Sequence, residues 1–186
     1  MLSQASRQLA DDHTALDQVL SQLRKALDRR DVLISHDKLD LFWARLAVHI
    51  RAEHLHLFPA VLTGLSERTS DQSVTPTPDQ VRTAIEQLRA DHDFFMHGLA
   101  QAMGIMRDLL KETDRQDIDR GIDTIRAAVL EVGKRLILHN ESEENQIYRW
   151  ATNNLSEQEQ AGLATRINTE LTNSPSRFSP EDWSNQ

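Results

Sequence analysis

The chain has 186 residues, enough for one domain with a sizeable core, and its 39% hydrophobic and 27% charged residues are typical of a soluble globular protein. A formal net charge of −8, without a basic stripe, argues against a nucleic-acid partner. The lack of cysteine excludes disulfides, thiolate metal sites and cysteine catalysis. The sequence shows no signal-peptide pattern and no apolar run long enough to span a membrane, so we predict a cytoplasmic protein with no membrane partner.

Apolar residues recur at spacings of three and four along four long segments, which predicts four amphipathic helices. The segments span roughly 3–29, 36–64, 78–110 and 115–154. Residues 66–78 are polar and contain prolines, which predicts a loop. The predicted core stripes consist of Leu9, Leu16, Leu20, Leu23, Leu27, Leu39, Phe42, Leu46, Leu57, Ala60, Val81, Ile85, Leu88, Phe95, Leu99, Met103, Met106, Leu110, Ile122, Ile125, Val129, Val132, Leu136, Ile147 and Trp150.

Two capping boxes mark helix starts. Thr77 precedes Pro78 and stands three residues before Gln80, and Ser156 stands three residues before Glu159. The second box predicts a short fifth helix. Its apolar face would consist of Leu163, Ile167 and Leu171.

Four long helices joined by short connections can bury their stripes only against one another. We therefore predict an all-α fold, an antiparallel (up-down-up-down) four-helix bundle. Residues 1–155 are assigned to this bundle, and residues 156–186 to a short C-terminal helix and a flexible tail that begins near Asn173. Whether the tail contacts the bundle or another protein, and whether the chain forms an oligomer, stays open.

Residues of metal-ligand type interrupt the apolar stripe of every predicted bundle helix. The first and third helices carry one histidine each, and the second and fourth carry a histidine followed four residues later by a glutamate. Two helical hairpins of the same design, packed face to face, would bring both sets together. Burying so many polar groups without a cation would be costly, which favours a metal centre. The predicted ligands are His13, His49, Glu53, His92, His139 and Glu143.

The residue types also indicate which metal the centre holds. A histidine and a glutamate four residues apart lie on one helix face, roughly 6 Å apart, so the imidazole can bind one ion while the carboxylate reaches a second. Four imidazoles and two bridging carboxylates supply eight donor atoms, whereas two octahedral ions need about twelve. An oxygen bridge would fill two of the remaining positions and leave an open one on each ion. This set suits iron or manganese, and its octahedral geometry without sulfur argues against structural zinc.

The other four histidines are interpreted differently. His36, at a helix start, and His97, away from the ligand face, are predicted to be solvated. His54 points away from the stripe. His56 shares the face of His49 but lies about two turns from it, so packing, a supporting role and ligation all stay open.

Two aspartates could support the centre, whereas the tyrosine of the fourth helix could not. Asp12 and Asp91 each precede a single histidine and could orient imidazoles, although we predict solvated surface acids. Tyr148 falls opposite the stripe of the fourth helix. No residue outside the ligand set is therefore predicted to donate a proton, and catalytic residues stay unassigned.

The order of the ligand residues, H…HxxxE…H…HxxxE, resembles the hemerythrin-like family, whose HHE cation-binding domain is a four-helix bundle around a non-haem di-iron centre. The resemblance covers about residues 1–155, and the six predicted ligands match the family in type, order and helical phase. The segment HIRAEHLHLFPAVL, which includes Phe58 and Pro59, is also similar to the family's second helix. The resemblance implies a centre of two non-haem iron ions, for which manganese or zinc could substitute.

This chain departs from the oxygen-carrying hemerythrins at two places. They have a second histidine on helix three, four residues from the first, where this chain has Leu88 and Met96. They also end with an aspartate at a spacing of five, where this chain has Glu143 at a spacing of four. The sequence therefore resembles the four-histidine, two-glutamate branch, found in bacterial hemerythrin-like proteins and in the iron-sensing domain of an F-box protein. This departure argues against reversible oxygen carriage.

We predict a binding protein: a di-iron domain that binds or senses oxygen or a related small ligand, such as nitric oxide or peroxide, or responds to iron. The alternatives are a di-iron enzyme acting on peroxide or nitric oxide, an iron-centre repair or stress protein, and a metal-free interaction bundle. The repair proteins of the wider family carry a cysteine-bearing N-terminal part that has no counterpart in this sequence.

Overall fold

The computed structural model describes residues 2–66 and 76–179. Most of the predicted loop 66–78 and the end of the predicted tail, 180–186, lie outside the described residues. The helical elements are α1 (Gln4–Asp28), α2 (Val32–Ala52), the π-helical turn η1 (Glu53–Leu57), α3 (Phe58–Ser66), α4 (Pro78–Leu109), α5 (Arg115–Ser142), the π-helical turn η2 (Glu143–Ile147), α6 (Tyr148–Asn154) and α7 (Glu157–Leu171).

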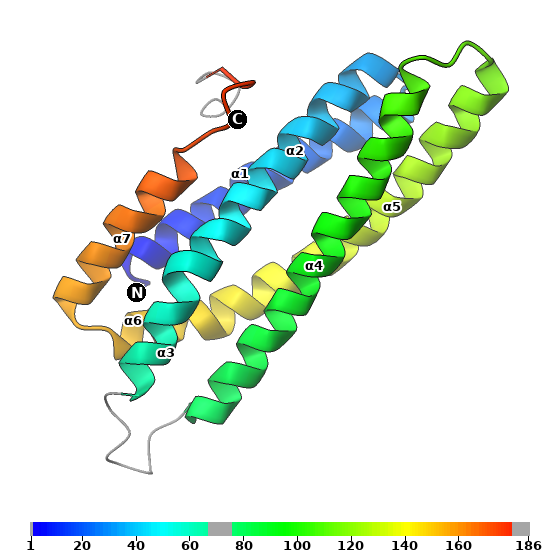
Figure 1. Ribbon diagram of the computed structural model, residues 1–186. Helices are drawn as coiled ribbons and strands as arrows, with labels where there is room; N and C mark the ends of the chain where they lie inside the picture. The colour runs from blue at the N-terminus through cyan, green and yellow to red at the C-terminus, as the bar shows by residue number, and fades with distance from the viewer. Residues whose placement is uncertain (1, 67–75, 180–186) are drawn as a thin grey trace.

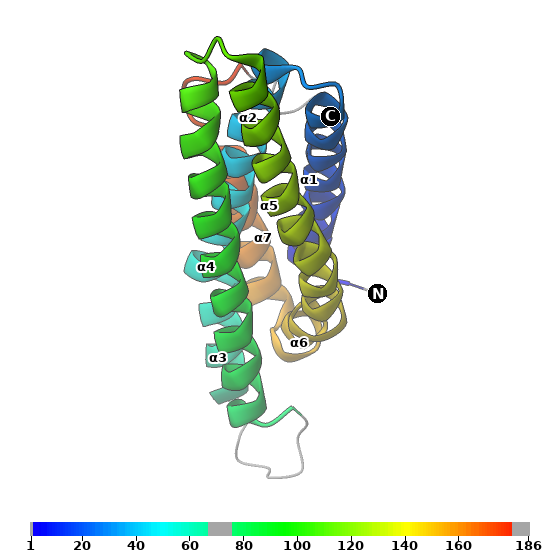
Figure 2. The same ribbon diagram turned by 90° about the vertical axis from the view of Figure 1, so that its right-hand side faces the viewer.

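Four long helical rods run antiparallel, as Figure 1 shows. They are α1, the continuous run α2–η1–α3, α4, and the continuous run α5–η2–α6. Helix α7 lies outside the four rods along α1 and α2 (Figures 1 and 2). The predicted antiparallel four-helix bundle with a short C-terminal helix is therefore confirmed. None of the described helices is long and apolar enough to cross a bilayer.

The helix starts follow local capping chemistry. Both predicted capping boxes form, at Thr77 for α4 and at Ser156 for α7. The prediction that the second helix begins near residue 36 is wrong, because α2 begins at Val32, where the Asp31 side chain accepts a hydrogen bond from the N–H of Ile34. Its first turn carries almost no core residue, so apolar periodicity could not reveal it.

The apolar core is divided into two clusters. One includes Phe42 and Phe95, and the other includes Phe58 and Leu163. Between them lies a layer of histidines. The ring centroid of Phe95 lies 5.2 Å from that of His139, and Phe58 stacks on His92 with ring centroids 6.1 Å apart. The two clusters thus enclose a polar layer from both sides along the bundle axis.

Beyond the π-helical turns, the core stripe is shifted by one residue. The predicted core residues Ala60 and Trp150 are only partly buried, whereas their neighbours Val61 and Ala151 are fully buried. Each π-helical turn inserts one extra residue into the helix, which rotates the following residues about the axis. A separate error of one residue occurs at the C-terminal end of α4, where Leu109 is buried and the predicted Leu110, just beyond the helix, is 40% exposed.

The segment after α7 folds back on the bundle as far as it is described. Arg177 donates two hydrogen bonds to the Asp40 carboxylate on α2, at 2.7 and 2.9 Å. Phe178 packs against the first core cluster. This contact does not test the division into residues 1–155 and 156–186, which stays a prediction.

Candidate metal centre

All six predicted ligands lie in the buried layer between the two core clusters. The histidines come from α1, α2, α4 and α5, and the glutamates are the first residues of η1 and η2. Their nitrogen and oxygen atoms form two groups that share both glutamates, and within each group these atoms lie within 4.8 Å of one another. The groups are His13, His49, Glu53 and Glu143, and His92, His139, Glu53 and Glu143. None of these side chains belongs to a residue that is more than 4% exposed.

Each glutamate is positioned by a π-helical turn. The N–H of Phe58 donates to the carbonyl of Glu53, and that of Tyr148 donates to the carbonyl of Glu143, five residues back instead of four. Turns of this kind occur frequently at functional sites. Here they allow the helix to present a carboxylate to the layer and then continue with a new face towards the core.

Two aspartates hold the outer nitrogens of two ligand histidines. His49 Nδ1 donates to Asp12 Oδ2 at 3.0 Å, and His139 Nδ1 donates to Asp91 Oδ2 at 3.2 Å. The other oxygen of each aspartate accepts from an arginine on the partner helix of its hairpin, Arg45 and Arg135 respectively. The prediction that these aspartates are solvated surface acids is therefore wrong. The sequence did contain a signal for this role. The two aspartates have matched positions in the repeat, and in each half an arginine stands four residues before the histidine that the aspartate contacts.

The other two ligand histidines have different outer partners. His13 Nδ1 donates to Glu144 Oε1 at 3.0 Å, whereas His92 Nδ1 lies 2.9 Å from His54 Nε2. The prediction that His54 points away from the stripe is wrong, because it follows the first residue of η1, where an α-helical projection fails. Both partners were missed as parts of the centre. Their common position, directly after each glutamate, was the signal in the sequence.

The inner nitrogens of the histidines face one another in pairs. His13 Nε2 lies 3.1 Å from His49 Nε2, and His92 Nε2 lies 3.0 Å from His139 Nε2. Because His13 and His49 both donate from Nδ1, their neutral rings would bring two lone pairs together, which requires a proton or a cation. Two nitrogens at right angles around an ion, each roughly 2.1 Å from it, lie about 3 Å apart. The nitrogen pairs therefore fit a metal ion.

The glutamates lie between the two nitrogen pairs. Glu53 places Oε1 3.5 Å from His49 Nε2 and Oε2 3.4 Å from His92 Nε2. Glu143 repeats this arrangement with the other two histidines, at 3.3 Å each. Glu53 Oε2 and both carboxylate oxygens of Glu143 are buried without a hydrogen-bond partner. A buried carboxylate with free lone pairs is costly unless a cation accepts them.

Comparison with known families agrees with this geometry. The model of the Hemerythrin HHE cation binding domain matches residues 4–151. The chain belongs to the hemerythrin family. Searches of curated proteins and of solved structures found no match. The buried histidine and glutamate groups of this hemerythrin domain could hold metal ions, while the role of each of the six as a ligand stays a prediction.

The hemerythrin domain also buries a tyrosine in its centre. Tyr148 is fully buried, donates to Glu53 Oε1 at 3.1 Å and lies 3.2 Å from His13 Nε2. Burial, together with the neighbouring Glu53 and Glu143, raises the pKa of its phenol well above the usual value, so the hydroxyl keeps its proton. The prediction that Tyr148 falls opposite the stripe is wrong, because η2 rotates the residues that follow it.

Without a bound ion, protons supply the positive charge of this centre. Burial disfavours a charged His49, but Glu53 and Asp12 outweigh burial and raise the pKa of His49 well above its usual value. The pKa values of His13 and His139 are also raised, against burial, by the surrounding carboxylates. Protons and metal ions therefore compete for the same nitrogens.

The glutamates are held in the ionised form by the same contacts. Burial alone would raise the pKa of Glu53, but His49 and His92 lower it well below its usual value. The pKa of Glu143 is also lowered, although burial and the neighbouring Glu53 charge both oppose this shift. Both carboxylates are therefore available to a cation at neutral pH.

The three remaining histidines of the hemerythrin domain lie outside the centre. His97 is exposed and contacts Gln101, as predicted for a solvated side chain. His36 contacts the exposed Asp37 and is partly exposed. His56 Nε2 lies 3.8 Å from Glu170 on α7, which favours a packing role over ligation.

Proposed function

We propose that this chain holds two non-haem iron ions in the six-residue layer and binds or senses a small molecule such as oxygen, nitric oxide or peroxide. The observation that carries the proposal is the pair of buried glutamates. In each of them one carboxylate oxygen faces one histidine pair and the other oxygen faces the other pair. Bridging carboxylates serve two ions, and a set of nitrogen and oxygen donors suits iron or manganese. A pair of iron ions supplies redox chemistry and positions at which a small ligand can bind.

The protein's own residues would orient the ions and exclude water. Each histidine has an outer partner that fixes its ring, and the two apolar clusters close the layer on both sides. In such a dry and enclosed layer a small molecule is favoured over a large substrate.

The first test is the metal content of the folded protein. Protein loaded anaerobically with ferrous iron and freed of excess metal should retain about two iron atoms per chain, because each carboxylate faces both metal positions. Elemental analysis against the protein concentration measures this ratio. His97→Ala should retain the same amount, since His97 lies outside the centre. A reproducible value near one would refute the dinuclear proposal, and a value near zero under all loading conditions would favour a metal-free bundle.

Tyr148 favours a second candidate function, a di-iron enzyme acting on peroxide. Its protonated hydroxyl touches Glu53 and His13 inside the layer, where it could donate a hydrogen bond or a proton to a bound substrate. A binding protein needs no such proton, although it could use the hydrogen bond. The two candidate functions therefore differ in whether Tyr148 is needed for turnover.

The second test measures turnover with hydrogen peroxide. If the chain is an enzyme, the loaded protein should consume many equivalents, His49→Ala should abolish turnover, and Tyr148→Phe should slow it by about 10²-fold while metal content stays unchanged. If the chain is a binding protein, peroxide or azide should instead give a stable spectral change without turnover. The absence of any spectral change with azide would mean that the centre has no open position, which contradicts both functions.

A further inference from the structure

The centre is built from two halves that match residue by residue. We call the part around His13 and His49 the first half and the part around His92 and His139 the second half. Ligands, aspartates and arginines recur at equivalent positions and make equivalent contacts. The matched pairs are Asp12 and Asp91, His13 and His92, Arg45 and Arg135, His49 and His139, and Glu53 and Glu143.

The match fails at the residue that follows each bridging glutamate. In the first half this residue is Glu144, whose carboxylate accepts from His13 Nδ1 at 3.0 Å. In the second half it is His54, whose imidazole lies 2.9 Å from His92 Nδ1. The two side chains occupy the same place in their halves, but one is an anion and the other is never negatively charged in either of its ordinary protonation states.

A second difference between the halves is smaller. One helical turn after His13 stands Asp17, an exposed residue whose charge interacts with His13 and with the opposite charge of Arg24. The equivalent residue, one turn after His92, is the neutral Met96. Because Arg24 offsets part of the Asp17 charge, the contrast between Glu144 and His54 remains the main difference in charge between the two halves.

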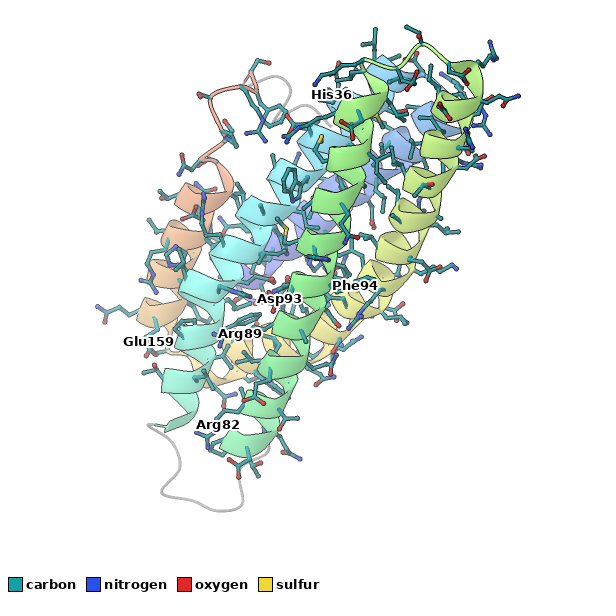
Figure 3. The ribbon with its side chains drawn as sticks, turned by 45° about the vertical axis from the view of Figure 1, so that its right-hand side comes forward. His36, Arg82, Arg89, Asp93, Phe94 and Glu159 are labelled. Atoms are coloured by element: carbon teal, nitrogen blue, oxygen red, sulfur yellow. The ribbon has the colours of Figure 1, made fainter. Side chains whose placement is uncertain are left out.

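Other charged side chains do not cancel this difference. Arg45 and Arg135 are each paired with an aspartate, so both halves carry the same type of ion pair, although the Arg45 side chain is 12% exposed and the Arg135 side chain 40%. Arg89 and Asp93, labelled on α4 in Figure 3, act on His54 with opposite signs. Tyr148 withdraws some charge from Glu53 Oε1, but a neutral donor offsets only part of a full carboxylate charge.

Negative charge next to an imidazole strengthens its donation to a metal ion and favours the ion with the higher charge. We propose that the two metal positions are unequal in charge preference, the first half taking a trivalent ion and the second half a divalent ion. This inference rests on the proposed dinuclear site. It assigns Glu144 and His54 as positioning residues that decide which ion occupies which half.

The test uses two metals that diffraction can tell apart. Crystals of the full chain loaded with one equivalent each of ferric iron and zinc are measured at the absorption edges of both metals. Iron should occupy the first half and zinc the second, with a preference of about tenfold or more. Equal mixing of the two metals, or iron in the second half, would overturn the proposal. A total metal content below two per chain would instead count against the proposed function.

Exchanging the two positioning residues should reverse the result. In the double variant His54→Glu with Glu144→His, iron should move to the second half, whereas a purely structural role would not move it there. The single variant Glu144→Gln, which keeps the shape of the side chain, should lower the preference about tenfold. Glu141→Gln is the matched control, because it removes an exposed charge on the same helix without a contact to His13. Unchanged placement in both test variants would show that these residues do not decide it.

Discussion

Chelation of the loaded protein should lower its melting temperature by about 10 °C, and this decrease should vanish in Glu53→Ala and in Glu143→Ala. Metal binds the folded arrangement far better than the unfolded chain, which stabilises the fold by about 3–4 kcal/mol at 100- to 1,000-fold excess over the dissociation constant. For a domain of this size, 1 kcal/mol corresponds to roughly 2–4 °C. Either alanine removes a carboxylate that faces both histidine pairs, so neither variant should hold two ions.

The measurement is thermal unfolding followed by circular dichroism, with and without chelator, for each variant. Taking the difference within each variant removes any change that the alanine causes in the metal-free fold. The bundle should remain folded after chelation, because the two apolar clusters on either side of the layer are intact. His97→Ala should behave as wild type. Equal chelator sensitivity in the wild type and both glutamate variants would mean that these carboxylates are not ligands.

The layer of six polar residues was predictable because the side chains of a regular α-helix repeat at a constant angular spacing, so the sequence shows which residues share a face. His13 and His92 lie on the same stripes as their leucine neighbours, and the phase holds up to His49, His139 and the glutamates that follow them. Helical phase and antiparallel packing together therefore place the side chains at one level. This reasoning uses only the positions of residues that precede the π-helical turns.

Beyond these turns, the same reasoning fails in a consistent way. A π-helical turn inserts one residue and shifts the apolar stripe that follows it, and a projection with a constant α-helical period does not follow this shift. Tyr148 and His54 were both assigned away from the centre, and Ala60 and Trp150 were placed on the stripe in place of the residues that follow them. All four errors occur inside or after η1 or η2. A comparison of the two repeats could have revealed these errors, because residues at equivalent positions of the repeats lie in similar surroundings.

The outer contacts of the histidines were harder to predict. Asp12 and Asp91 are acids on helices rich in charge, and most such acids are solvated. Only the folded structure shows that each lies between a ligand histidine and an arginine of the next helix. The pairing depends on the packing of two helices, which no single-helix pattern contains.

The stabilisation by metal should grow as the pH rises from about 5.5 to about 8, since binding requires neutral imidazoles. The pKa values of His13, His49 and His139 are raised in the metal-free fold, so these residues keep protons that an ion must displace. Each displaced proton should change the apparent affinity by about tenfold per pH unit, as long as the pH lies below the raised pKa.

The metal-free fold should show the opposite trend. A histidine whose pKa is raised by folding contributes stability that is fully present below about pH 6.5 and is lost as the pH rises through its folded-state pKa. Glu53 and Glu143, with lowered pKa values, contribute stability that is present above about pH 4.5 and lost as the pH falls through theirs. The metal-free protein should therefore be most stable between about pH 4.5 and about pH 6.5.

The two trends together make the difference in melting temperature between loaded and metal-free protein widen with pH. A divalent ion that stays soluble and binds reversibly, such as manganese or zinc, keeps the comparison free of iron oxidation. Glu143→Ala should show little metal-dependent difference at any pH in this range, because it lacks a carboxylate of the centre. A difference that stays constant from about pH 5.5 to about pH 8 would mean that binding displaces no protons. In that case the metal ion would not bind between the histidine nitrogens that face one another at 3.0 and 3.1 Å.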